Sequence, residues 1–260
     1  MVPPLELQPF ALPGLMPGVQ VRCVFTSRLG GVSTAPFDGA NLSFDVGDDH
    51  MSVAQNRTAL AEQTGLAFFA ELKQVHGDAL VTDIEPTALP HFRCGPATRE
   101  ADALSTSQPG VGLCIKTADC QPILLAHKGG RFVAALHAGW RGNVLNLPGS
   151  AVARLCAYYG VAPDELVAVR GPSLGPDHAQ FTRFEAEFGP AFEPFYHAAT
   201  QTVDLWSLTR HQLAQAGLKE CDIHSLDLCT LAGVARFFSY RAAPAPARRT
   251  GRQMSLIWLE

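Results

Sequence analysis

The stretch that decides the fold is residues 111–142, VGLCIKTADCQPILLAHKGGRFVAALHAGWRG. It contains three short apolar runs, Gly112 to Thr117, Pro122 to Ala126 and Arg131 to His137, whose length and composition are typical of β-strands. Only turns rich in small or polar residues separate them, so the regular alternation of strand and helix that builds a Rossmann fold is absent. The stretch therefore predicts three strands of a sheet that is not of the Rossmann type.

Outside this stretch, strands and helices are mixed in irregular order. After an extended arm over the first twenty residues, we expect strands at Val19 to Thr26, Leu72 to Val75, Ala79 to Thr82, Leu166 to Arg170 and Met254 to Trp258. The spacing of apolar residues predicts helices at Val53 to Gly65, Ser150 to Tyr159, Phe184 to Phe195 and Leu205 to Ala216, the last with Asp204 as its N-cap. We predict an α+β fold, layered, with mixed β-sheets flanked by helices. No linker rich in Pro, Gly or Ser divides residues 1–260, so we expect a single domain.

Composition narrows the class of protein. Hydrophobic residues make up 47% and charged residues 17% of the chain, as in folded globular proteins. The net charge of −4 favours neither nucleic acid nor an anionic membrane surface as a partner, and the one basic cluster, Arg248 to Arg252, is expected to be a solvated turn. No apolar run reaches the roughly 20 residues that span a bilayer. Seven cysteines without a CxxC pair, and no recognisable secretory signal, predict a cytoplasmic protein.

Three metal-competent residues each lie at the end of an apolar run beside small residues: His76, Cys120 and His137. Strand ends that enter glycine turns are places where side chains converge on a rigid site. Two imidazoles and one thiolate are good zinc ligands, and three protein ligands leave a fourth tetrahedral position open, as in catalytic zinc. The pattern therefore favours a catalytic metal site, with zinc as the expected metal and copper as the alternative.

Other interpretations of the same residues remain open. Taken singly, a histidine at a strand end is more often hydrogen-bonded than metal-bound, and a cysteine in an apolar run is more often a core residue. Cys120 and His137 would also suit a nucleophile and its base in a metal-free hydrolase. Asp119, next to Cys120, is a candidate catalytic partner if the local backbone forms a turn. Further histidines are expected at the surface: His50, His91, His127, His178, His197, His211 and His224.

Candidates for binding a substrate anion are fewer. Arg28, in a turn with two adjacent glycines, and Arg141, after Trp140, have the forked guanidinium that suits phosphate. A surface ion pair explains either arginine equally well from the sequence. Asn41 is a candidate for a ligand contact or for capping a turn.

Together these segments resemble one family closely, the laccase-domain or multicopper polyphenol oxidase proteins, now regarded as purine nucleoside phosphorylases. The resemblance covers nearly the whole chain in the family's order, and Thr117-Ala-Asp-Cys followed by His137-Ala-Gly-Trp-Arg-Gly is its most specific part. Other matching stretches are Phe25-Thr-Ser-Arg-Leu-Gly-Gly-Val-Ser, Asn41-Leu-Ser-Phe-Asp-Val-Gly-Asp-Asp, Asn56-Arg57, Gln74-Val-His-Gly, Ala101-Asp-Ala-Leu, Gly171-Pro-Ser-Leu-Gly-Pro, Phe237-Phe-Ser-Tyr-Arg and Thr250-Gly-Arg.

The resemblance implies a single catalytic domain with a layered α/β structure and a zinc site formed by His76, Cys120 and His137. It implies phosphorolysis of adenosine, inosine, guanosine and methylthioadenosine, with adenosine deamination as a second activity. The partners would then be a small nucleoside and phosphate, with the protein a monomer or homodimer. The H-x-E and P-C-x-x-C signature of nucleobase deaminases is absent, so a deaminase site here would have a different design.

The chain departs from the family pattern at two places. After Gly175-Pro176 many relatives have Cys-Cys-Tyr-Glu, whereas this chain has Asp177-His-Ala-Gln-Phe, which puts Gln180 where the glutamate is expected. Asp45 lies where many relatives have histidine.

Three other functions compete with nucleoside phosphorolysis. A copper-dependent polyphenol oxidase would use the same two histidines and cysteine, a known blue-copper ligand set. A true laccase also needs a multinuclear copper cluster, usually held by H-x-H motifs, and no two of the nine histidines lie that close in sequence. The other rivals are a cysteine hydrolase or amidase acting on cell-wall peptides and a non-catalytic metal-binding module.

Overall fold

The computed structural model describes residues 2–260 and contains two six-stranded sheets packed face to face. The first sheet has the order β1-β2-β14-β7-β3-β5, formed by Leu7–Phe10, Val21–Thr26, Gln253–Leu259, Val111–Thr117, Phe68–Ala70 and Thr87–Ala88. The second has the order β13-β10-β8-β9-β6-β4, formed by Ile223–Ser225, Leu166–Arg170, Gln121–His127, Val133–Ala138, Ala103–Thr106 and Leu80–Val81. A separate hairpin pairs β11 (Tyr196–His197) with β12 (Thr202–Val203).

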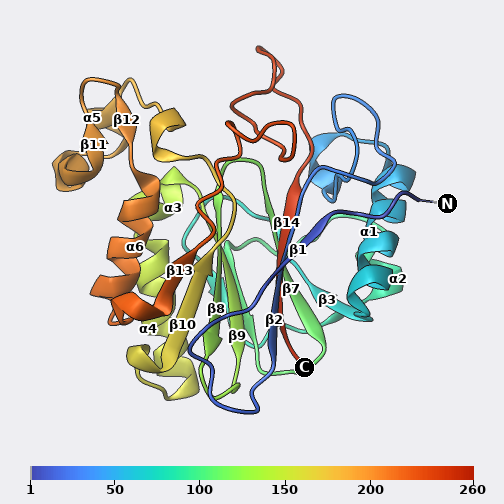
Figure 1. Cartoon of the computed structure of the whole chain (residues 1–260), viewed down its shortest axis with the longest axis horizontal. Helices are drawn as coiled ribbons and strands as arrows, with labels where there is room; N and C mark the ends of the chain where they lie inside the picture. Colours follow the sequence, from blue (N-terminus) through green and yellow to red (C-terminus); the bar gives the residue numbers. More distant parts are fainter. Residues whose placement is uncertain (1) are drawn as a thin grey trace.

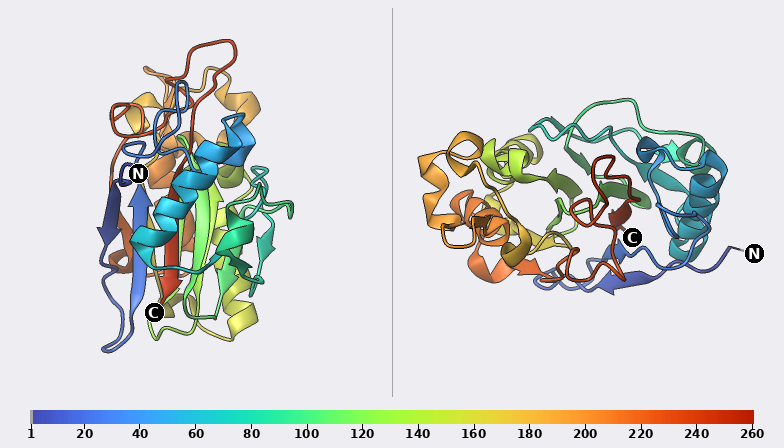
Figure 2. Two further views of the ribbon diagram at one scale, coloured as in Figure 1. Left: turned by 90° about the vertical axis from the view of Figure 1, so that its right-hand side faces the viewer. Right: turned by 90° about the horizontal axis from the view of Figure 1, so that it is seen from above.

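Helices cover the outer face of each sheet (Figure 1). The α-helices are α1 (His50–Thr64), α2 (Leu89–Phe92), α3 (Trp140–Val144), α4 (Leu147–Tyr159), α5 (Phe184–Glu187) and α6 (Leu205–Gln215). Short 3-10 turns occur at Phe44–Val46, Pro163–Glu165, Pro176–His178, Pro190–Phe195 and Glu220–Asp222. Helices α1 and α2 lie beside the first sheet and α4 and α6 beside the second, so the layers run helix, sheet, sheet, helix; the view from above in Figure 2 shows both sheets between the two groups of helices.

Both sheets contain parallel and antiparallel pairs. In the first sheet β7 runs parallel to β3 and antiparallel to β14. In the second, β8 is antiparallel to β9 and to β10, whereas β10 is parallel to β13. The predicted α+β fold with mixed, layered sheets is therefore confirmed, and the three runs of residues 111–142 form β7, β8 and β9.

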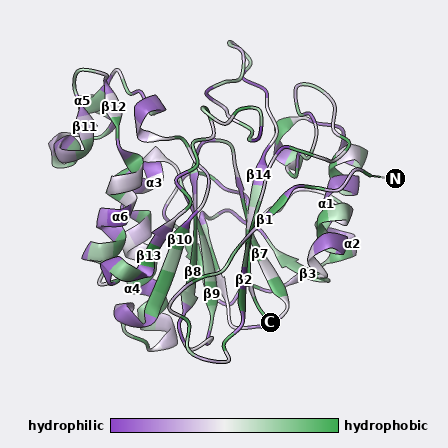
Figure 3. Cartoon of the chain, in the orientation of Figure 1, coloured by the Kyte–Doolittle hydropathy of each residue, from purple (hydrophilic) through white to green (hydrophobic). Residues whose placement is uncertain are grey.

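Side-chain alternation along these strands divides the core into layers. Leu113 and Ile115 of β7, together with Val133 and Ala135 of β9, belong to the buried cluster between the two sheets. The intervening side chains, such as Leu136, pack instead against the outer helices. Because period-two alternation directs successive side chains to opposite faces, a strand buried on both faces is apolar throughout. In Figure 3 the central strands are accordingly coloured mostly as hydrophobic.

Some expectations for individual segments are wrong. Leu72 to Val75 is not a strand, since only Lys73 forms an isolated bridge there, with Glu100. The side chain of Gln74 takes the place of strand pairing, because its amide bonds both the N–H (2.9 Å) and the C=O (2.8 Å) of Lys116.

Two other segments differ from the sequence-based expectation. The expected helix from Phe184 to Phe195 is broken at Gly189, whose φ of 84° lies in the left-handed region, and continues as a 3-10 turn. His127 is buried, only 4% exposed, and its Nδ1 accepts the N–H of Gly129. By contrast, Asp204 caps α6 as predicted, accepting the N–H of Ser207.

A long connection carries the chain from one sheet to the other. Residues 226–252, which we call the crossing segment, run from β13 at the edge of the second sheet to β14 in the first, and loop over one end of the sandwich, at the top of Figure 1. The segment contains no helix or strand. It closes the end of the inter-sheet core at which β7, β9 and β10 terminate.

Within residues 2–260, no helix has both the length and the apolar character needed to cross a bilayer.

Candidate metal centre

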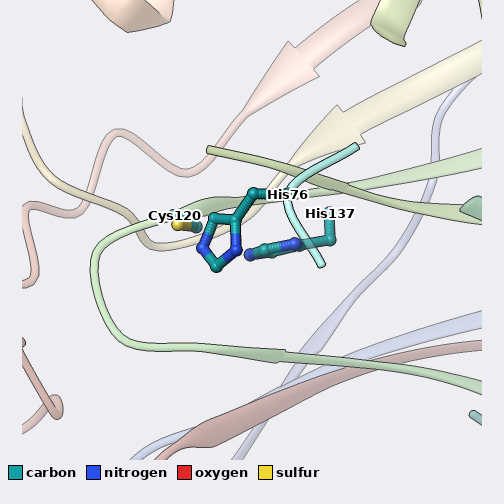
Figure 4. Close-up of side chains that lie close together, drawn as sticks. All are labelled: His76, Cys120 and His137. Atoms are coloured by element: carbon teal, nitrogen blue, oxygen red, sulfur yellow. The ribbon is translucent and has the colours of Figure 1, made fainter. Parts of the chain in front are cut away.

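The three predicted ligands come from three different parts of the fold. His76 lies in the loop between β3 and β4, Cys120 in the turn between β7 and β8, and His137 in β9. One donor atom of each lies within 4.8 Å of the other two, and Figure 4 shows the three side chains gathered together. His137 is buried, Cys120 half-buried and His76 exposed, so the group is accessible to solvent on the His76 side.

Strand register explains why these residues meet. Gln121 pairs with Ala138 and Pro122 with His137, which brings Cys120, just before β8, beside the end of β9. Side chains alternate along β9, and His137 lies two residues after Ala135 and four after Val133, which face the other sheet. The His137 ring therefore also faces the space between the sheets.

Gly139 allows the ligands to approach so closely. A Cβ at this position would lie 2.9 Å from the Cys120 Sγ and 3.1 Å from the His76 Cδ2, and no side chain fits there without displacing them. The Gly in His-Ala-Gly-Trp-Arg-Gly thus has a steric reason in this structure.

Asp102, which sequence reasoning did not single out, organises two of the three ligands. Its buried carboxylate contacts the Nδ1 of His137 at 2.8 Å and accepts the backbone N–H groups of Val75, His76 and Gly77 at 3.2, 2.9 and 2.7 Å. Burial acts to raise the pKa of Asp102, but these donors and the charge of His137 outweigh it, so the pKa is lowered. The signal in the sequence was an aspartate inside the apolar run Ala101 to Leu104.

The same contacts determine how the imidazole is presented. With Nδ1 of His137 bonded to a carboxylate, its Nε2 is the nitrogen left to face a metal, which is the usual arrangement for ligating histidines.

Electrostatics favour the ionised thiol. Burial alone would raise the pKa of Cys120, but His137 and His76 lower it to about 6. Burial would lower the pKa of His137, yet the Cys120 and Asp102 charges raise it to about 9. The thiolate is the form that ligates a metal, and metal binding displaces the proton from the imidazole. One thiolate and two imidazoles whose donor atoms lie within 4.8 Å of one another suit a metal ion such as zinc, with one coordination position open.

Asp119 lies in a turn, with a φ of 90°, but its carboxylate is engaged elsewhere. Oδ1 accepts the hydroxyl of Thr230 at 2.7 Å, and Oδ2 accepts the N–H of Arg241 at 2.6 Å. Its backbone carbonyl accepts the N–H of Leu174. Asp119 therefore ties the Cys120 turn to the crossing segment.

The polar groups of Arg28 and Asn41 are used within the protein. The Arg28 guanidinium donates to the carbonyl and carboxylate of Asp38 and to the carbonyl of Val234, and stacks on Phe238. It lines a cavity of about 400 Å³ whose lining residues include none of the three ligands.

Asn41 is fully buried. Its Nδ2 donates to the carbonyl of Ser43 and to Asp48, and its Oδ1 accepts the N–H groups of Ser43 and Arg252. Asn41 thereby links two loops at the end of the first sheet.

The remaining candidate positions are exposed. Arg141 stacks on the ring of Trp140 at 4.2 Å, and its guanidinium forms no ion pair within residues 2–260. Gln180 and Asp177 lie at the surface, and the carbonyl of Gln180 accepts the guanidinium of Arg241. Asp45, partly exposed, pairs with Lys116 at 3.1 Å.

Comparison with known proteins identifies the family of the chain. Residues 22–260 match the family described as multi-copper polyphenol oxidoreductase laccase. A purine nucleoside phosphorylase of Pseudomonas aeruginosa is 36% identical over 249 residues, covering 93% of this chain and 94% of that protein. Purine nucleoside phosphorylase YfiH of Escherichia coli is 33% identical over 249 residues, covering 92% of this chain and 94% of its own length.

A solved structure has the same fold. The crystal structure of the Bacillus licheniformis hypothetical protein YfiH superimposes with a TM-score of 0.80 at 28% identity, covering 93% of each chain. Because the family model matches nearly the whole chain, the chain belongs to the multi-copper polyphenol oxidoreductase laccase family, and several similar proteins carry the name purine nucleoside phosphorylase.

Proposed function

We propose that the chain is a zinc-dependent purine nucleoside phosphorylase acting on adenosine, inosine, guanosine and methylthioadenosine, with adenosine deamination as a second activity. The observation that carries the proposal is the convergence of His76, Cys120 and His137. It occurs in a chain that is similar, over more than nine-tenths of their length, to proteins named purine nucleoside phosphorylase. The seven unpaired cysteines suit a reducing compartment, and we propose a cytoplasmic monomer or homodimer.

The proposed reaction makes defined demands on the site. An oxygen of hydrogen phosphate forms a bond to the anomeric carbon of the ribose, and the glycosidic C–N bond breaks. The electron pair of that bond leaves with the purine, which takes up the proton that the phosphate loses. A bound zinc ion would supply a Lewis acid that stabilises negative charge on a substrate atom at the open coordination position. The products are the free purine and ribose 1-phosphate.

The chain's own residues would hold the reactants in place. Asp102 orients the His137 ring and the His76 loop, and Gly139 leaves room beside Cys120. Arg141, whose guanidinium has no ion-pair partner within residues 2–260, is a proposed contact for phosphate or nucleoside. Arg28 and Asn41 would contact substrate only by exchanging their present protein partners. Asp119 would act by holding the Cys120 turn in position.

One rival function has an observation in its favour. Cys120 with a lowered pKa, His137 beside it and Asp102 behind the imidazole form the order of groups found in cysteine hydrolases. Against that interpretation, a second imidazole, His76, lies within 4.8 Å of the same sulfur. A hydrolase has no need for this residue, whereas a metal site does.

A His76→Ala variant separates the two. In the zinc enzyme it should lose bound metal, measured by elemental analysis, together with turnover. In a metal-free cysteine hydrolase the Cys120–His137–Asp102 group stays intact, and activity should persist. His178→Ala, at an exposed histidine of the 3-10 turn Pro176–His178, is the matched control and should match the wild type.

The phosphorolysis itself is tested with inosine, with and without inorganic phosphate. Inosine lacks the amino group at C6, so deamination cannot confuse the result. The proposal requires that hypoxanthine and ribose 1-phosphate form together and only when phosphate is present. Equal release of hypoxanthine with free ribose in both conditions would mean a nucleosidase. Oxidation of phenols with bound copper, and no cleavage of inosine, would support the oxidase instead.

A further inference from the structure

The guanidinium of Arg252 donates hydrogen bonds to the protein through Nη1 only, as far as residues 2–260 show. The residue is half-buried at the start of β14, and its Nη1 donates to the carbonyls of Thr250 and Gly251 at 2.9 and 3.0 Å. Within residues 2–260, Nε and Nη2 form no hydrogen bond, and no carboxylate forms an ion pair with the guanidinium. The Nε–Nη2 edge, which is the edge that binds oxyanions side-on, is therefore free.

The backbone beneath this side chain is held rigidly. The N–H of Arg252 donates to the Oδ1 of Asn41 at 2.9 Å, and its carbonyl accepts the N–H of Leu42. A Cβ on Gly251 would lie 2.6 Å from the ring of Phe238 and 3.0 Å from the Cβ of Asn41, so the chain fits there only as glycine. A guanidinium on such a fixed base is preorganised for a ligand.

Its strand places it near the turn that carries Cys120. Gln253, the next residue, pairs with Thr117, three positions before Cys120. Burial lowers the pKa of Arg252, and the charges of Cys120 and Asp119 oppose this shift without reversing it. The Thr117 hydroxyl, which is buried, also has no partner within residues 2–260.

Among residues 2–260, no carboxylate forms an ion pair with Arg252. The Asp119 carboxylate is already bonded to Thr230 and Arg241, and Cys120 belongs to the metal centre. Removing a cation from water without a partner is unfavourable, so a half-buried site of this kind favours an incoming anion. By comparison, Arg28 already faces Asp38, and Arg141 is solvent-exposed on Trp140.

We propose that Arg252 binds the phosphate co-substrate beside Cys120, with its free Nε and Nη2 donating to two phosphate oxygens. The inference rests on the proposed phosphorolysis and deepens it, because it assigns the phosphate contact to a residue of the basic cluster at 248–252. The solvated turn expected there is buried at Thr250 and Gly251 and half-buried at Arg252.

The test compares Arg252→Gln and Arg252→Lys with Arg249→Gln, in the metal-loaded enzyme. Arg249 belongs to the same basic cluster but is exposed and donates to the carbonyl of Gly47, so it controls for a general loss of positive charge. Steady-state kinetics would give the KM for phosphate and for inosine separately. Phosphate binding would be measured independently, as the rise in melting temperature when phosphate replaces chloride at constant ionic strength.

Arg252→Gln should raise the KM for phosphate about tenfold to a hundredfold, as expected for loss of charge-assisted hydrogen bonds, with little change in the KM for inosine or in metal content. Arg252→Lys should be intermediate, since it keeps the charge but not the fork. Arg249→Gln should match the wild type. An unchanged KM for phosphate in Arg252→Gln, or an increase confined to the KM for inosine, would overturn the inference while leaving phosphorolysis intact. If Arg252→Gln does not fold, the KM of Arg252→Lys for phosphate replaces it in the test. A raised value would support the site, and an unchanged value would refute it.

Failure of the proposed function has a different signature. If the wild type cleaves inosine without phosphate, phosphorolysis is wrong, and the melting experiment alone then decides about the anion site. Stabilisation by phosphate that is present in the wild type and lost in Arg252→Gln would support the site. Absence of stabilisation in the wild type would refute it.

Discussion

Asp102 connects two metal-site residues that are far apart in sequence. One oxygen of its carboxylate contacts the ring of His137 and the N–H of His76, and the other accepts the N–H groups of Val75 and Gly77. An aspartate can accept all four because both of its oxygens are acceptors. The positions of both imidazoles therefore depend on the Asp102 carboxylate.

Asp102→Asn should weaken metal binding. The amide keeps the shape but turns one acceptor into a donor, so two of the four contacts become unfavourable. Loss of such a partner typically lowers metal affinity by about 10- to 100-fold, which a competition assay with a chelator would measure. Asp78 lies close to His76 in sequence, and its half-exposed carboxylate pairs with Arg154. Asp78→Asn should therefore leave the metal affinity unchanged. Equal effects in the two variants would refute a specific role for Asp102.

The close packing at Gly139 leads to a second prediction about a single residue. Gly139→Ala should lower metal occupancy and turnover, because the added methyl would meet the Cys120 Sγ at 2.9 Å and the His76 Cδ2 at 3.1 Å. Gly95→Ala, where nothing lies within 4 Å and φ is not positive, is the matched control. Metal content per chain is the readout. Full occupancy in Gly139→Ala would mean that the ligands can shift without cost.

At the scale of the elements, the turn before β8 helps to hold the crossing segment in position. Asp119 in that turn bonds Thr230 and Arg241, and Gln253 at the start of β14 bonds both the N–H and the carbonyl of Phe238. These side chains add to the few backbone hydrogen bonds of a segment that forms no strand. The end of the sandwich that holds the metal centre is thus closed by these side-chain hydrogen bonds together with a short backbone bridge between Ser173 and Cys229. Each side-chain bond contributes about 1.5–3 kcal/mol where a charged group takes part.

Asp119→Gly should loosen the crossing segment without straining the turn, since glycine accepts the φ of 90°. We expect faster amide hydrogen exchange at Arg241, whose N–H loses its acceptor, and unchanged exchange in β8 and β9. Asp119→Asn is the matched variant: its amide can bond Thr230 and Arg241 with an oxygen and an NH₂ group, so exchange should stay close to that of the wild type. If Asp119→Gly leaves Arg241 protected, the segment is held by other contacts.

At the scale of the whole molecule, a buried ionic cluster joins α1 to the first sheet. Arg57, fully buried between the rings of Phe44 and Phe92, forms a two-pronged pair with Glu71, which also pairs with Lys116 of β7 at 2.9 Å. Burial would raise the pKa of Glu71, but the two cations outweigh it and lower the pKa below the ordinary 4.5. Breaking such a pair by removing one partner costs about 3–5 kcal/mol.

The sign of the pH effect follows from this lowered pKa. A carboxyl group with a lower pKa in the folded than in the unfolded state stabilises the fold fully above the unfolded value, and this contribution disappears as the pH falls through the folded pKa. Glu71→Gln should therefore reduce the free energy of unfolding at neutral pH and flatten its decline below pH 4.5, as measured by urea titrations from pH 7 to pH 3. Glu62→Gln, at an exposed glutamate of α1, is the control. An equally steep decline in Glu71→Gln and wild type would show that other carboxylates dominate acid unfolding.

Local patterns predicted most of the elements. Leu166–Arg170 is a strand with the expected bounds, and α6 begins after Asp204 as expected, because strand composition and capping act over a few residues. The segment 72–75 escaped prediction because the Gln74 side chain, rather than backbone pairing, binds it to Lys116. His127 escaped because its burial depends on the sheet and loop that surround it.

The sequence by itself determined the mixed α+β class, since strand and helix patterns are local features. It also marked His76, Cys120 and His137 as candidate ligands, through their residue types, their small neighbours and the family resemblance, although the strand expected before His76 does not form. Only the tertiary structure decided that these donors come within 4.8 Å of one another, that Asp102 orients two of them, and that Arg252 keeps one edge of its guanidinium free. The physical reason is that each of these facts depends on strand register and on a crossing between sheets. Such pairings join residues tens to hundreds of positions apart, where no local spacing rule applies.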